Sequence, residues 1–187
     1  MMLVVLLQGG AVACSDPEEP PEQTGQCFNY SGWDGSAPAV SLRNRLLNDG
    51  EGATAGIFRR ACNASACHGK PTGGAGRLYL GPPIKDSLTQ QLVAIQPADI
   101  TAVLANLNNV PSKTNSSVLR VKPSDPQNSF MMMKFDSCFE GVSAGCQPLT
   151  GAKTSNPCGD RMPQGGELDA TERDEVRRWI AQGALDG

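Results

Sequence analysis

Apolar residues recur at helical spacing in several separate stretches of the chain, and no stretch of any length alternates between apolar and polar residues. The clearest helix is expected directly after Leu168, where Asp169 and Glu172 have the spacing of a capping box and Gly183 stands at the expected end. The apolar face of this helix consists of Val176, Trp179 and Ile180. Helical periodicity without strand alternation predicts a mostly α-helical fold.

Shorter helices are predicted in five further stretches, with irregular chain between them. These stretches are residues 40–47, 53–62, 86–95, 99–106 and 129–135. In the second stretch, Ile57 and Phe58 are expected to face inward, and Arg59 and Arg60 are expected to face outward. Residues 136–161 are predicted to form a long polar loop that contains three cysteines. The expected fold class is therefore a small, mostly α domain with long irregular loops.

The composition restricts the class of protein further. Of the 187 residues, 39 % are hydrophobic, which is ordinary for a globular chain and argues against a disordered or fibrous protein. The 16 basic and 19 acidic residues give a net charge of −3, and no basic stripe is visible. Nucleic acid is therefore not an expected partner. The chain has a single histidine, so a histidine-rich metal site is excluded.

Residues 1–13 are predicted to be an export signal peptide. An apolar run at 1–7 is followed by small residues before Cys14, and the run is far shorter than the ~20 residues that span a bilayer. The residues around Cys14 resemble a bacterial lipobox. This resemblance implies a lipidated Cys14 that anchors the protein on the periplasmic side of the cell envelope, with the outer membrane favoured. An ordinary cleaved signal, with Cys14 kept as a disulfide partner, is the alternative.

Residues 14–40 are expected to form a tether and a turn-rich segment ahead of a domain at 41–187. The stretch from Asp16 to Glu22 is acidic and rich in proline, with no apolar surface to bury. Such a composition favours an extended, partly polyproline-like chain. A folded domain on this tether could swing while its anchor stays in the membrane.

The segment with the most specific chemistry runs from Cys62 to His68. Two cysteines, the second followed directly by histidine, form the attachment pattern of c-type haem, in which the thiols bond the vinyl groups and the histidine binds iron. Four residues separate Cys62 from Cys67 in place of the usual two, so the small residues 64–66 must loop outward. The alternatives are a Cys62–Cys67 disulfide beside a surface His68, or a zinc site with a third thiolate such as Cys158.

Further segments occur in a fixed order around this motif. Ile57 and Phe58 precede it, residues 121–130 read Val-Lys-Pro-Ser-Asp-Pro-Gln-Asn-Ser-Phe, and Arg161-Met162-Pro163 precedes the last helix. Together these segments resemble the mono-haem c-type cytochrome domains of exported bacterial lipoproteins. The resemblance covers residues 55–187, and it implies a cytochrome c-like helical domain around one covalent haem c.

The same resemblance implies a role for each residue of the predicted site. Cys62 and Cys67 would attach the haem, His68 would be the proximal ligand to iron, and Met162 would be the distal ligand. The Met131–Met133 run could compete as a ligand or copper site, but its spacing beside two phenylalanines favours core packing. No catalytic residue is predicted.

Four cysteines remain once the haem and the lipid are assigned, namely Cys27, Cys138, Cys146 and Cys158. In an exported protein they suggest two disulfides, and the sequence leaves all three pairings open. A bridge that includes Cys158 would brace the loop that presents Met162.

The expected function is single-electron transfer by an exported, lipid-anchored cytochrome that is not an enzyme. Its expected partners are other redox proteins, and its membrane contact is Cys14. A basic rim around the haem edge is one interpretation of four cations, and scattered solubilising charges are the other; these cations are Arg59, Arg60, Lys70 and Arg161. The alternative functions are an open-site haem protein with peroxidase or ligand-sensing activity, and a haem-free, disulfide-stapled envelope lipoprotein.

Overall fold

The computed structural model describes residues 27–63, 67–72, 75–150, 154, 156–164, 166 and 168–187. The predictions for the signal peptide, for Cys14 and for the beginning of the tether lie outside these residues. The described α-helices are α1 (Ile57–Ala61), α2 (Pro97–Leu107), α3 (Phe130–Asp136) and α4 (Ala170–Ala181). Shorter elements are the π-helix η1 (Leu42–Leu46) and the 3-10 helices η2 (Gly52–Thr54), η3 (Ala75–Arg77) and η4 (Ser143–Gly145). Within the described ranges there is no strand, only isolated bridges. The mostly helical fold class with long loops is confirmed.

Helix α4 begins and ends as its sequence predicts. The side chain of Asp169 accepts a hydrogen bond from the Glu172 N–H at 2.8 Å, and Glu172 accepts one from the Asp169 N–H at 3.0 Å. These bonds satisfy two N–H groups that the first turn of a helix leaves without partners. Gly183 follows the helix with a φ of +99°, a conformation that costs glycine little.

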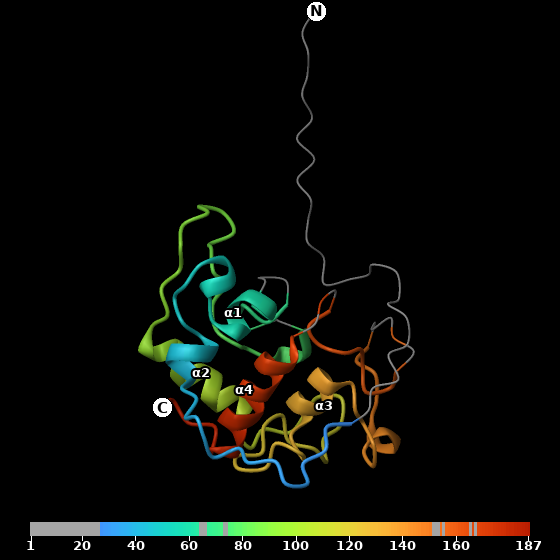
Figure 1. The fold of residues 1–187 in the computed structure, drawn as a ribbon. Helices are drawn as coiled ribbons and strands as arrows, with labels where there is room; N and C mark the ends of the chain where they lie inside the picture. The colour runs from blue at the N-terminus through green and yellow to red at the C-terminus, as the bar shows by residue number, and fades with distance from the viewer. Residues whose placement is uncertain are drawn as a thin grey trace, which may run out of the picture.

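One hydrophobic cluster holds the helices together. Helix α4 lies against α3 and also meets α1, where the rings of Phe58 and Trp179 pack edge to face with centroids 6.0 Å apart (Figure 1). The apolar residues of α2 and α3 complete the cluster, including Val103, Leu107 and Met132. Burial of the methionine run confirms the core-packing interpretation of Met131–Met133.

The helix predicted at 86–95 does not form. The carboxylate of Asp86 accepts hydrogen bonds from the N–H groups of Leu88 and Thr89, and Lys85 pairs with Leu92 in an antiparallel bridge. The side chain thus competes successfully for donors that a helix would need. Residues 85–92 form a turn that projects from the rest of the fold (Figure 1).

Arg59 is buried, contrary to the outward orientation expected from the helical pattern. Only 3 % of the residue is exposed, and its guanidinium donates to the carbonyls of Pro83 and Val93 and to the carboxylate of Asp49. Arg59 therefore holds both ends of the projecting turn against α1.

The segment that precedes η1 packs on α4. Trp33 donates its indole N–H to Asp174, and the guanidinium of Arg177 lies 3.6 Å from the centre of the Phe28 ring while it binds Asp136. A disulfide joins Cys27 to Cys138 across 111 residues of sequence. None of the helices in the described ranges has the length and apolar character that crossing a bilayer requires.

Candidate functional site

The backbones of Cys62 and His68 are bonded to each other and to neighbouring segments. Cys62 caps α1, its N–H bonds the carbonyl of Phe58 at 2.9 Å, and its own carbonyl accepts from the His68 N–H at 3.2 Å. The carbonyl of His68 in turn accepts from the Leu80 N–H at 3.0 Å. Both residues are buried, at 6 % and 7 % exposure. A backbone hydrogen bond thus joins the two ends of the motif, and residues 64–66 between them lie outside the described part.

The environment of His68 favours a neutral imidazole. Burial lowers the pKa of His68, and the positive charges of Arg120 and Lys134 lower it further, while the carbonyls of Leu78 and Ala75 oppose this shift. The ring atom Nδ1 lies 3.3 Å from the Leu78 oxygen. Neutral imidazole is the form that binds metals, and a hydrogen bond from one ring nitrogen to a carbonyl is the usual way to orient the other toward a metal.

The two cysteines of the motif differ in state. Cys62 is a free, buried thiol, and burial raises its pKa to about 12, so that it is protonated at neutral pH. Cys67 is disulfide-bonded. Because Cys62 is free, the Cys62–Cys67 disulfide considered as an alternative is absent.

Met162 is held against the end of α3. Its N–H donates to the carbonyl of Lys134 at 3.1 Å, and the neighbouring Arg161 donates from Nε to the carbonyl of Phe135 at 3.3 Å. The Met162 side chain packs at the edge of the main hydrophobic cluster. The Met162–Pro163 peptide bond is cis. The two hydrogen bonds fix the backbone of the predicted distal ligand on its N-terminal side.

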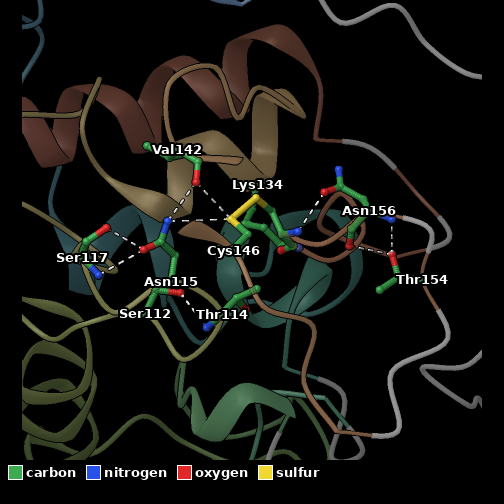
Figure 2. The surroundings of a disulfide bond; sticks show 10 residues. Ser112, Thr114, Asn115, Ser117, Lys134, Val142, Cys146, Thr154 and Asn156 are labelled. Carbon is green, nitrogen blue, oxygen red and sulfur yellow. Dashed lines mark hydrogen bonds between the residues drawn. A yellow bond between two sulfur atoms is a disulfide. The ribbon is translucent and has the colours of Figure 1, made fainter. Parts of the chain in front are cut away.

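A second disulfide and a half-buried lysine, Lys134, support the loop ahead of Met162. Cys146 is bonded to Cys158, and the carbonyl of Cys158 accepts from Lys134 Nζ at 3.1 Å. Figure 2 shows Asn115 donating to the Val142 carbonyl on the other side of this bridge. Burial lowers the pKa of Lys134 to about 8. The prediction of two disulfides among the four remaining cysteines is confirmed, with the pairing Cys27–Cys138 and Cys146–Cys158.

Lys134 affects both predicted axial ligands, His68 through its charge and Met162 through its backbone. Its charge acts on the His68 imidazole, and its backbone carbonyl binds the Met162 N–H. Sequence reasoning did not single out this residue, because a lysine at the end of a short helix has the pattern of an exposed side chain.

The structure does not assemble the other predicted sites. Cys158 is occupied in its disulfide and so cannot serve as a zinc ligand, and no group of three or more His, Cys, Asp or Glu side chains gathers within the described residues. Of the predicted basic rim, Arg59 is buried, Arg60 pairs with Glu172, and Lys70 is exposed. The prediction of a basic rim that includes Arg59 is therefore wrong.

Comparisons of the chain with protein-family models, with curated protein sequences and with solved structures gave no significant match.

Proposed function

We propose that this chain is an exported mono-haem c-type cytochrome that carries single electrons between redox proteins. In this proposal Cys62 and Cys67 attach one haem c covalently, His68 is its proximal ligand and Met162 its distal ligand. The domain would adopt a cytochrome c-like arrangement around the haem, and a lipid on Cys14 would anchor it to the periplasmic side of the envelope.

The observation that carries the proposal is the burial of Cys62 and of an oriented His68, whose backbones a hydrogen bond joins. Nδ1 of His68 faces the Leu78 carbonyl, and a proton held on Nδ1 leaves the lone pair of Nε2 for a metal. A neutral, oriented imidazole next to a buried cysteine matches the donor set of a c-type haem site. A surface histidine beside a structural disulfide would require neither burial nor this orientation.

Each residue contributes through binding or positioning. Haem bound at this site would supply an iron that accepts and releases one electron. His68 and Met162 would hold that iron, and methionine ligation raises the reduction potential of a haem relative to a stronger donor. The apolar residues packed around Cys62 would exclude water, and the exposed charges nearby would face transient redox partners, which dock through small interfaces.

The disulfide of Cys67 sets a condition on haem attachment. A sulfur already bonded to another sulfur has no valence left for a thioether, so this disulfide must be reduced before Cys67 can bond a vinyl group. An external dithiol would supply the two electrons and two protons, which leaves free thiols at Cys67 and at its partner and a disulfide on the reductant. Cys62 needs no such step, because it is already a free thiol.

A haem stain of a denaturing gel tests the proposal directly. The full chain is expressed in a bacterial host that attaches c-type haem in its periplasm, beside a Cys62→Ala/Cys67→Ala double variant as control. Covalent haem survives denaturation, so the wild-type band should stain and the control band should not. An unstained wild-type band, at protein levels equal to a stained cytochrome run alongside, would reject the proposal.

A haem-free envelope domain is the second candidate function, and one observation favours it. Cys67 is disulfide-bonded, and two further disulfides join Cys27 to Cys138 and Cys146 to Cys158. Such bridges are typical of exported domains that act by binding other proteins. The same stain separates the two functions, because this candidate predicts no haem in any variant.

A further inference from the structure

The segment that follows His68 is fastened to the end of α2 by two polar side chains. Asn106 Oδ1 accepts from the Tyr79 N–H at 3.0 Å, and Asn106 Nδ2 lies 3.4 Å from the carbonyl of Arg77. Arg120 donates to the carbonyl of Gly76 at 3.1 Å. These bonds involve residues on both sides of Leu78, whose carbonyl faces His68 Nδ1.

The two side chains also bind each other. One terminal nitrogen of Arg120 donates to the Asn106 backbone oxygen at 2.8 Å and to Asn106 Oδ1 at 2.7 Å. Only 7 % of Arg120 is exposed, and burial lowers its pKa. Movement of the acceptors would destabilise the folded protein, because each donor of a buried guanidinium that is left unpaired carries a desolvation penalty. The Asn106–Arg120 pair is therefore a rigid support for residues 76–79.

We infer that Asn106 and Arg120 are positioning residues, which hold the Leu78 carbonyl so that His68 keeps its proton on Nδ1 and presents Nε2 to the haem iron. The inference rests on the proposed function for the identity of the metal group. Without the support, residues 76–79 can shift relative to the ring, and the bond to Leu78 weakens. A weaker bond makes imidazole a poorer donor to iron, which disfavours the ferric state.

Because the chain has one histidine, nuclear magnetic resonance of ¹⁵N-labelled histidine reports on His68 alone. The variant is Asn106→Ala in the full chain. The matched control is Asn108→Ala, which also removes one part-buried side-chain hydrogen bond at the end of α2, to the carbonyl of Ala184 at 2.8 Å, without touching residues 76–79. Arg120→Lys keeps the charge but not the forked contacts, and it carries the test if Asn106→Ala does not fold.

In the haem-loaded ferrous protein, Asn106→Ala should speed the exchange of the Nδ1 proton with solvent by roughly threefold or more, as expected when about half of an ordinary hydrogen bond is lost. The haem reduction potential of Asn106→Ala should also be higher than that of the wild-type protein. In protein without haem, the ratio of Nδ1–H to Nε2–H tautomer should fall by a similar factor, roughly threefold.

The inference is overturned if Asn106→Ala leaves the exchange rate and the tautomer ratio at the wild-type values, or if Asn108→Ala changes them equally. Arg120→Lys should shift the same quantities in the same direction, and no shift in a folded Arg120→Lys protein would count against the inference as well. A negative haem stain would reject the proposed function alone, since the tautomer ratio of the haem-free protein would still decide whether the pair positions His68.

Discussion

At the scale of single residues, the proposed site depends on two side chains that have no substitute. His68 is the only imidazole in the chain, and Met162 lies in a loop whose backbone is bonded to the Lys134 carbonyl of α3. A thioether is a weak ligand, so a loose segment would hold it poorly on iron. The hydrogen bond from the Met162 N–H to the Lys134 carbonyl restricts the backbone of Met162, and the ring of Pro163 restricts the residue that follows.

Replacing Met162 by alanine should expose the iron. Ferric wild-type protein is expected to show the weak far-red absorption band of methionine–iron ligation, a marker that the resemblance to c-type cytochromes implies. Met162→Ala should abolish this band, lower the reduction potential and allow cyanide or carbon monoxide to bind at low concentration.

The buried Met132 supplies the matched control. Met132→Leu preserves the volume of a core residue that is 1 % exposed, so the far-red band should persist in it. Loss of the band in Met132→Leu together with its survival in Met162→Ala would show that the methionine run binds iron and that Met162 does not.

At the scale of elements, the projecting turn at 85–92 depends on a residue outside it. Arg59→Met removes the donors to Pro83 and Val93 but keeps an apolar stem in the buried space. We expect limited proteolysis to cut within 85–92 several-fold faster in this variant. Arg60→Met should be cut at the wild-type rate, since Arg60 pairs with Glu172 at the surface of α4. Equal cleavage of the two variants would contradict the role given to Arg59.

Helix α4 should lose stability when its cap is removed. Asp169→Ala deletes the acceptor for the Glu172 N–H, and such a change costs about 1 kcal/mol of the free energy of unfolding. Chemical denaturation measures it. Asp169→Asn retains an acceptor and should stay within a few tenths of a kcal/mol of wild type. A loss in Asp169→Asn as large as in Asp169→Ala would mean that the carboxylate acts by its charge.

Local signals in the sequence predicted the helices well where no competing hydrogen-bond partner changed the backbone or the side-chain orientation. The capping box and Gly183 placed α4, and the apolar spacing placed α2 and α3. The helix predicted at 86–95 failed because Asp86 competes for backbone N–H groups, and Arg59 was oriented wrongly because its acceptors lie 10 to 34 residues away. Periodicity contains no information on either kind of hydrogen-bond partner.

At the scale of the whole molecule, the fold joins distant segments around the proposed site. The Cys27–Cys138 bridge ties the segment after the predicted tether to the end of α3, and Cys146–Cys158 braces the chain ahead of Met162. The sequence indicated Cys62, Cys67, His68 and Met162 through motif order, but it could not indicate Asn106, Arg120 or Lys134. The roles of these three follow from contacts between segments that are far apart in the chain.

The most direct test of covalent haem attachment is the reduced pyridine haemochrome spectrum of purified protein. Wild type should give the spectrum of a c-type haem with two thioether bonds. Cys62→Ala and Cys67→Ala should each give the red-shifted spectrum of a single thioether. A Cys62→Ala protein with the wild-type spectrum would show that Cys62 does not bond the haem, and a wild-type protein with no haemochrome at all would contradict the account as a whole.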